Sequence, residues 1–325
     1  MHARIAGTGS YAPKTVVRNV DLEKLVETSD AWIAERTGIR ERRKADPDEA
    51  TSDMCVKAAR QALEMAGWTA ADLDLIIVGT ISPDYPFPSC AVLVQSKLGA
   101  KNAFAFDLSA ACAGSLFGLS MADKFIRAGT VKKALIVGAE LLTRITNWSD
   151  RNTCVLFGDG AGAMLVEPTD GPAGLISAHL FTDGDAAKIL YQPGGGSAEP
   201  CSQKVLDEKL ATIHMEGKEV YKFAVRSLVQ AMETALAANG MRAGDLHHII
   251  AHQANLRIIE AVCKRLDVPM RKVWLNLEKY GNTSSASLPT TLDEANRAGI
   301  LKPGELIGMM AIGAGMAWGS AIVRW

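Results

Sequence analysis

Hydrophobic and polar positions change their spacing along the chain in a way that predicts an α/β protein. Residues 103–108 (AFAFDL) alternate and are rich in aromatic side chains, which is typical of a strand. Residues 108–122 carry no charge, so a helix in this segment would be apolar on every side and would lie inside the protein. Cys112 stands among small residues at the turn between the two. Free cysteine is usually a small buried hydrophobic side chain, so position alone favours a structural role.

A pattern of helix, glycine, turn and buried strand occurs twice along the chain. Two pairs of segments match in the same order: 62–80 with 235–254, and 127–140 with 297–315. The first pair aligns at a constant offset of 173 residues, which places Gly67 opposite Gly240. Self-similarity of this kind predicts a duplicated βαβ-type unit, with an N-terminal half of 1–170 and a C-terminal half of 171–325.

The duplication places three polar side chains at corresponding strand ends. The counterpart of Cys112 in the second half falls at or just beyond Asn282, and His252 aligns with Gly79, just past a strand. Ligands of open α/β sheets bind outside the carboxyl ends of strands. By itself His252 is more often a structural residue, and Asn282 more often a turn or cap residue. Together the three residue types indicate a nucleophile flanked by two polar groups.

Catalysis at Cys112 fits its local sequence. A helix N-terminus directs its free N–H groups and positive dipole at the sulfur, which we expect to favour the thiolate. The neighbouring alanines and glycine leave room for a substrate carbonyl close to the backbone. The glycine-rich segment 312–319 (IGAGMAWG) is either an ordinary tight turn or a loop that completes an oxyanion hole with the N–H groups around Cys112.

Composition and charge argue against several other classes of function. The chain has 35 Lys and Arg against 36 Asp and Glu, and no basic run exceeds RERRK at 40–44, so a nucleic-acid ligand is not expected. The N-terminus lacks the apolar core of a signal peptide and 108–122 is too short to cross a bilayer, which predicts a cytoplasmic protein. The six cysteines form no CxxC pair and the six histidines no HExxH, so we expect neither a disulfide framework nor a metal site.

Two glycine clusters lack the context of a phosphate-binding loop. Residues 7–13 (GTGSYAP) run into a proline and residues 157–163 (FGDGAGA) precede a strand, so both are interpreted as turns. Residues 28–43 (TSDAWIAERTGIRERR) have the pattern of an amphipathic helix, with Trp32 and Arg36 one turn apart. Such a face is ordinarily solvated, but an aromatic ring beside an arginine also suits stacking on a purine close to a phosphate.

The ordered set of motifs resembles the β-ketoacyl-acyl-carrier-protein synthase III family, the initiating condensing enzymes of type II fatty acid synthesis. The similarity runs from GTGSYAP through TSDAWIAERTGIRERR, AACAG, FGDGAGA, HQANLR and YGNTSSAS to WGSA at 318, which is nearly the whole chain. It implies an α/β, thiolase-like, duplicated αβαβα five-layered fold and a homodimer.

The resemblance also implies a reaction. Cys112 accepts an acyl group from acyl-CoA and releases CoA, and malonyl-acyl carrier protein then loses CO2. Hydrogen bonds from His252 and Asn282 hold the resulting enolate, which attacks the thioester to give β-ketoacyl-carrier-protein. The backbone N–H groups of Cys112 and Gly315 form the oxyanion hole. No metal or other cofactor takes part, since acyl-CoA is a substrate.

Further residues take roles from the same resemblance. The residues expected to bind CoA are Thr28, Trp32, Arg36, Arg151, Tyr221 and Asn255. Arg257 is expected to contact the acidic carrier protein. Phe87, reaching over from the other subunit, closes the acyl pocket, and its bulk predicts a short primer such as acetyl-CoA.

Three alternative functions remain open at this point. Residues 114–118 and 141–150 depart from better-known members, so a related condensing enzyme with long-chain, branched or quinolone-type acyl substrates is one alternative. A cysteine thioester hydrolase would need His252 close enough to deprotonate Cys112, together with free access of water. A non-catalytic binding protein on this fold is the third, and the intact Cys, His and Asn set argues against it.

Overall fold

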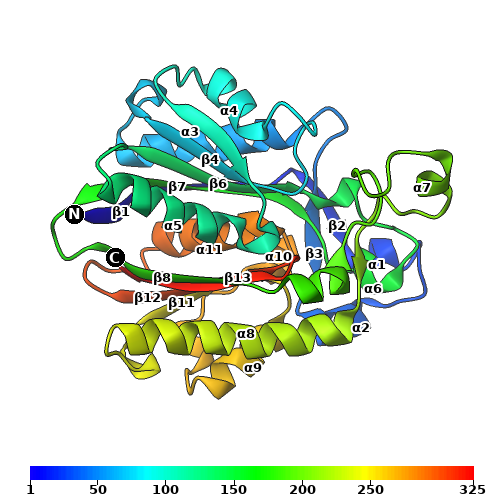
Figure 1. Ribbon diagram of the computed structural model, residues 1–325. Helices are drawn as coiled ribbons and strands as arrows, with labels where there is room; N and C mark the ends of the chain where they lie inside the picture. Colours follow the sequence, from blue (N-terminus) through cyan, green and yellow to red (C-terminus); the bar gives the residue numbers. More distant parts are fainter.

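Two β-sheets alternate with three layers of helices (Figure 1). The computed structural model describes residues 1–325. The first sheet has the strand order β1 (His2–Tyr11), β7 (Asp159–Thr169), β6 (Ala134–Leu141), β4 (Leu75–Gly79) and β5 (Phe104–Leu108). The second has the order β11 (His248–Ala251), β12 (Leu306–Gly313), β13 (Ala317–Arg324) and β8 (Gly174–Thr182).

Helices cover the outer faces of both sheets and fill the space between them (Figure 1). The outer helices are α3 (Thr51–Ala66) and α4 (Cys90–Leu98) on the first sheet, and α8 (Gly217–Ala238) and α9 (Leu256–Arg265) on the second. The central helices are α5 (Gly114–Arg127) and α11 (Ser287–Arg297), and they share one hydrophobic core with both sheets. The predicted five-layered αβαβα arrangement is therefore confirmed.

The two sheets are built in the same way. β4 runs parallel to β5 and β6, and β7 is antiparallel to β6 and β1. In the second sheet β11 runs parallel to β12, and β13 is antiparallel to β12 and β8. A bridge between Ile249 and Val273 stands where β5 pairs in the first sheet. All strands of the first sheet come before residue 170, and all strands of the second come after it. The division into halves of 1–170 and 171–325 stays a prediction.

The matched segments fold alike in both halves. α3 is followed by Gly67 with φ 66°, and α8 by Gly240 with φ 62°, so each helix is stopped by a glycine in the left-handed region. The short 3-10 turns η1 (Ala70–Asp72) and η5 (Ala243–Asp245) come next. In each turn the final aspartate accepts a hydrogen bond of 2.8 Å from the backbone N–H three residues earlier. The repeat seen in the sequence is thus a repeat of local hydrogen bonding.

Both central helices begin with the same unusual turn. α5 follows η2 (Ala111–Ala113) and α11 follows η7 (Ser284–Ala286). The first residues of these turns have positive φ angles of 44° for Ala111 and 50° for Ser284, which residues other than glycine seldom adopt. Cys112 is the second residue of its turn, and its counterpart is Ser285. The prediction that Cys112 stands at a strand-to-helix turn, with its counterpart just beyond Asn282, is confirmed.

The remaining elements gather mainly at one end of the layers (Figure 1). The short strands are β2 (Thr15–Arg18), β3 (Glu41–Lys44), β9 (Leu190–Tyr191) and β10 (His214–Met215). The short helices are α1 (Asn19–Leu22), α2 (Asp30–Thr37), α6 (Arg151–Cys154), α7 (Gln203–Asp207) and α10 (Leu277–Tyr280), with 3-10 turns η3 (Leu142–Arg144), η4 (Gly184–Ile189) and η6 (Met270–Lys272). None of the helices combines the length and apolar character needed to span a membrane.

Two predictions about local structure are wrong. The helix expected over 28–43 ends with α2 at Gly38, whose φ is 81°, and the chain continues as β3. Arg42 in β3 is fully buried and donates to Asn19 and to two backbone carbonyls, so tertiary contacts override the helical pattern. The glycine clusters are not turns either. They lie mostly within β1 and β7, where a side chain at Gly9 or Gly162 would overlap the backbone of α3 or α11.

Glycine at position 138 tests how closely the central layer packs. A methyl group there would overlap the backbone carbonyl of Ser285, so Gly138→Ala should force η7 away from β6. We expect a loss of about 3 kcal/mol in the free energy of unfolding. Gly99→Ala, at φ 76° in open space, is the control and should cost about 1 kcal/mol. Chemical denaturation measures both, and equal losses would contradict the close packing.

Candidate active site

Cys112 lies where two cavities meet. The first cavity has a volume of about 650 Å³ and runs from Trp32 and Arg36 on α2 to Cys112. The second has a volume of about 490 Å³, also reaches Cys112 and is lined mainly by hydrophobic residues. Phe157 borders both cavities beside the cysteine. A group attached to the sulfur can therefore extend into either space.

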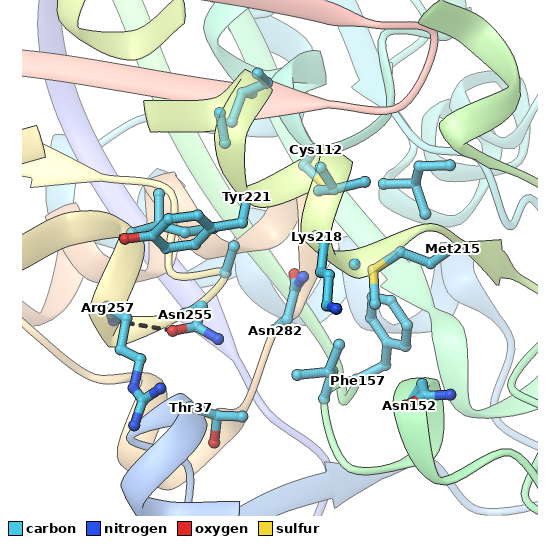
Figure 2. Close-up of a pocket in the computed structure, with 18 of the residues that line it drawn as sticks. Thr37, Cys112, Asn152, Phe157, Met215, Lys218, Tyr221, Asn255, Arg257 and Asn282 are labelled. Carbon is cyan, nitrogen blue, oxygen red and sulfur yellow. Dashed lines mark hydrogen bonds between the residues drawn. The ribbon is translucent and has the colours of Figure 1, made fainter. Parts of the chain in front are cut away.

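Asn282 is fixed in the wall of the first cavity by its backbone and by one side-chain atom. Its N–H donates to the carbonyl of Leu156 at 2.8 Å, and its carbonyl accepts from Gly158 at 3.0 Å. Its Oδ1 accepts from the N–H of Ser284 at 2.8 Å. This bond orients the amide so that the Nδ2 group is left to donate into the cavity, and in Figure 2 the amide end points toward Cys112.

His252 follows the last residue of β11 and also lines the first cavity. Its side chain is buried, and burial lowers its pKa to about 4. The imidazole is therefore neutral at physiological pH and carries one N–H. Its Nδ1 has no partner within the protein. A neutral histidine in this position can donate a hydrogen bond to an oxygen that gains negative charge.

The expectation of a resting thiolate at Cys112 is not met. Burial raises the pKa of its thiol to about 12, against the opposing effects of Ser284 and of its own backbone N–H. The negative charge of Glu140 acts in the same direction as burial. Sequence analysis considered only the helix N-terminus and left out the loss of solvent around the sulfur. In the unliganded chain Cys112 is thus a thiol, and catalysis has to remove its proton.

Two residues that line the second cavity, Cys112 and Gly315, have backbone N–H groups without an acceptor. The N–H of Cys112 makes no hydrogen bond to another residue, and the same holds for Gly315 in the turn between β12 and β13. Gly315 has φ 119° and lines the second cavity. A side chain at Gly313 would overlap the backbone nitrogen of Cys112, so glycine is needed there for the two segments to meet. The arrangement suits the predicted oxyanion hole.

Most of the residues expected to bind CoA gather around the mouth of the first cavity. Trp32, Arg36, Tyr221 and Asn255 line this cavity. The guanidinium groups of Arg36 and Arg151 lie 4.8 and 3.9 Å from the centre of the Trp32 ring. An adenine stacked between Trp32 and Arg151 would therefore have to displace Arg151 from the ring. Thr28 and Arg151 line neither cavity, and only Arg151 is connected to this group, through its contact with Trp32.

Asn255 and Arg257 connect α9 to α2. Asn255 caps α9 by accepting from the N–H of Arg257, a contact drawn in Figure 2, and it donates to the carbonyl of Arg36. Arg257 itself donates to the backbone and carboxylate of Glu35. Its side chain remains about half exposed, at 47 %, so it is still available to a partner protein.

Phe87 does not reach the site of its own chain. It precedes α4, is 86 % exposed and lines neither cavity. The role expected for Phe87 requires a second copy of the chain and stays a prediction.

Sequence analysis missed several residues that the structure places here. Lys218 and Met215 line the first cavity and Ser284 the second (Figure 2 shows the first two). Glu140 lies completely buried behind Ser284. A signal for Glu140 did exist, because a single carboxylate within the apolar strand ALIVGAEL needs partners in the fold. The chain contains no group of three or more His, Cys, Asp or Glu side chains that could hold a metal ion.

Comparisons with known proteins agree with this site. Residues 106–184 match the family model of 3-oxoacyl-[acyl-carrier-protein] synthase III, and residues 236–325 match its C-terminal model. A β-ketoacyl-[acyl-carrier-protein] synthase III of Caldanaerobacter subterraneus is 50% identical over 323 residues, which cover 99% of this chain and 98% of that one.

Solved structures extend the similarity to the fold. The crystal structure of 3-oxoacyl-[acyl-carrier-protein] synthase III from Aquifex aeolicus has a TM-score of 0.93 and 43% identity, covering 99% of this chain and 100% of that one. The priming β-ketosynthase of the R1128 polyketide pathway has a TM-score of 0.91 and 36% identity, covering 99% and 96%. The chain therefore belongs to the 3-oxoacyl-acyl-carrier-protein synthase III family of thiolase-fold acyltransferases.

Proposed function

We propose that the chain transfers an acyl group from acyl-CoA to Cys112 and condenses it with malonyl-acyl-carrier-protein, releasing CoA and CO2. The observation that carries this proposal is the position of Cys112 between two cavities, with His252 and Asn282 in the wall of one. A reaction with two successive thioester substrates needs one space that both can enter and another that shelters the acyl group. Family membership argues against the hydrolase and the non-catalytic alternatives.

In the first step the sulfur of Cys112 attacks the carbonyl carbon of the acyl-CoA thioester. The N–H groups of Cys112 and Gly315 donate to the oxyanion as it forms. The bond from that carbon to the CoA sulfur then breaks, and CoA leaves through the first cavity. The basic and aromatic side chains at the cavity mouth, Trp32 and Arg36 among them, are suited to hold the nucleotide.

In the second step malonyl-acyl-carrier-protein enters the same cavity and loses CO2. The electron pair left behind makes an enolate, whose oxygen accepts hydrogen bonds from the neutral imidazole of His252 and the Nδ2 group of Asn282. A neutral donor suits this step, because a fixed positive charge would also stabilise the carboxylate of the ground state. The carbon of the enolate attacks the thioester on Cys112, and the sulfur leaves.

Acetyl-CoA is the expected primer, and a homodimer is the expected assembly. Ile81, Tyr85 and Phe87 form an exposed apolar stretch, at 37, 57 and 86 % exposure, which suits an interface between two copies. From there Phe87 of a second copy would limit the length of the acyl chain. A carrier protein docking near Arg257 and a cytoplasmic location complete the proposal.

A condensing enzyme of a specialised pathway is the second candidate. The observation that favours it is the second cavity, because about 490 Å³ is far more than an acetyl group fills within one chain. The similarity to a priming β-ketosynthase of a polyketide pathway points the same way.

Acyl transfer can be measured first, with a panel of acyl-CoAs from acetyl to decanoyl. We expect acetyl-CoA to acylate Cys112 stoichiometrically, as read by intact-protein and peptide mass spectrometry. Cys112→Ala should abolish labelling, whereas Cys201→Ala, at an exposed cysteine, should leave it unchanged. Labelling by long or branched chains alone would favour the specialised pathway. Steady multiple-turnover release of CoA without malonyl-acyl-carrier-protein would refute condensation.

Loss of either enolate donor should affect the two steps unequally. His252→Ala and Asn282→Ala should slow decarboxylation by about 100-fold or more, while the initial acylation of Cys112 changes little. Asn152→Ala is the matched control, since Asn152 lines the same cavity and its side chain makes no hydrogen bond. Decarboxylation of malonyl-carrier-protein and acylation by acyl-CoA are measured separately. Equal losses in both reactions would contradict the division of roles.

Chain-length selection tests the role given to Phe87. Phe87→Thr should widen the range of acyl-CoAs that label Cys112, because it removes a large side chain from the expected wall of the second cavity. Leu206→Thr, at an exposed apolar residue on α7, is the control. An unchanged chain-length profile in the dimer would remove Phe87 from the pocket.

A further inference from the structure

Glu140 is a completely buried carboxyl group near the end of β6, and all of its hydrogen-bond donors are neutral. Its oxygens accept from the hydroxyl groups of Thr80 at 3.2 Å and Ser82 at 2.5 Å, and from the N–H of Ile81 at 3.1 Å. The hydroxyl of Ser284 donates to the remaining oxygen at 3.0 Å. Four donors and no cation around one carboxylate form a site built to hold a negative charge that can also take up a proton.

Ser284 connects this carboxylate to the nucleophile. Its turn η7 packs against η2, and Ser284 and Cys112 both line the second cavity. The Ser284 hydroxyl donates to Glu140 at 3.0 Å, and Ser284 lies close enough to Cys112 to lower the pKa of its thiol. A hydroxyl has one proton and two lone pairs. With its proton directed at Glu140, Ser284 offers a lone pair to the thiol proton, directly or through one water molecule.

We propose that Ser284 and Glu140 form a proton relay for Cys112, in which the thiol proton passes to the Ser284 oxygen as the Ser284 proton passes to the Glu140 carboxylate. The sulfur is then a thiolate, and it forms its bond to the acyl carbon as the bond from that carbon to the CoA sulfur breaks. CoA leaves as a thiolate and takes a proton from solvent. The acylated enzyme stores the original proton on Glu140.

The condensation step returns that proton. The carbanion made by loss of CO2 forms a carbon–carbon bond to the acyl group, and the bond to the Cys112 sulfur breaks. The sulfur departs with the electron pair as a thiolate. It takes back the proton along the same path, with Glu140 donating to Ser284 and Ser284 to Cys112. One turnover thus consumes a single proton from solvent, the one bound by CoA.

The electrostatic setting supports Glu140 as the acceptor. Burial raises its pKa to about 7, against the hydrogen bonds from Ser82, Ile81, Ser284 and Thr80. A group with this pKa can both take and return a proton at neutral pH. His252, the other titratable group of the site, has a pKa lowered to about 4 by burial and is a poor acceptor for a thiol proton. Ser284 acts on the reacting sulfur, and Glu140 acts through Ser284.

The relay rests on the proposed role of Cys112, but its test does not need acyl-CoA. Alkylation of Cys112 by iodoacetamide, followed by peptide mass spectrometry between pH 5.5 and 9.5, reports how readily the sulfur loses its proton as it attacks. In the wild type we expect the rate to rise as Glu140 ionises, around neutral pH. In Ser284→Ala the rate at pH 7.5 should fall by about 100-fold, and the rise should move to alkaline pH. Acylation by the best acyl-CoA should follow the same profiles.

Thr80→Val is the control that separates a relay from a structural role. It removes one donor to Glu140, while Thr80 lines neither cavity. Losing a donor raises the pKa of a carboxylate, so the alkylation profile should shift upward by about 0.5 pH unit or more, with its plateau unchanged. Glu140→Gln should abolish the increase in the rate of Cys112 alkylation near neutral pH.

Alanine is expected to fit at position 284, since Ala111 adopts the same positive φ at the equivalent turn position. If Ser284→Ala does not fold, Ser284→Gly keeps the test, because glycine accepts this φ without strain. If the Ser284 and Thr80 variants show the same dependence of Cys112 alkylation on pH as the wild type, the relay is refuted. If no acyl-CoA labels the wild type, the proposed function fails on its own, and the iodoacetamide profiles still decide the relay.

Discussion

The close approach of the two central turns, η2 and η7, is the constraint on which the rest of the structure depends. Three glycines, Gly79, Gly114 and Gly138, surround Ser285, and a side chain on any of them would overlap that residue. Gly313 makes the corresponding contact with the backbone of Cys112. Because both turns meet at the middle of the molecule, residues from the two halves share one site. The packing of η7 against η2 brings Ser284 close to Cys112, and the packing of η7 against β6 brings Ser284 to Glu140.

Burial shifts the pKa of three titratable side chains at this centre. It raises the pKa of the Cys112 thiol and of the Glu140 carboxyl, and it lowers the pKa of His252. Each group is thereby pushed toward its neutral form. Neutrality suits the histidine as a hydrogen-bond donor, but it opposes the nucleophile. The same burial that makes His252 useful thus creates the need for a proton acceptor near Cys112.

The sequence predicts those features that local periodicity and duplication control. The turn at Cys112, the end of β11 before His252 and the duplication follow from repeated patterns of helix, glycine and strand, whereas the five layers were implied by the resemblance. The prediction that Asn282 follows a strand is wrong, because the helix α10 precedes it. Features set by distant contacts were missed. The helical pattern of 28–43 is interrupted at Gly38, and Arg42 beyond it is buried in β3. Burial also outweighs the effect of a helix N-terminus on the pKa of Cys112. Glu140 and Ser284 are 144 residues apart, so no spacing rule connects them.

Duplication also explains why the site is asymmetric. Cys112 and Ser285 occupy equivalent turns, yet only the cysteine borders a cavity, while the serine hydroxyl is sealed without a partner. Two identical half-length chains related by a two-fold axis would carry the same residue at both positions. A nucleophile from one turn facing an amide and a hydroxyl from the other therefore requires two halves that differ in sequence, and a single chain provides them in a fixed one-to-one ratio. Within one chain the first half supplies the nucleophile at this pair of turns, and the second half supplies the polar groups that face it.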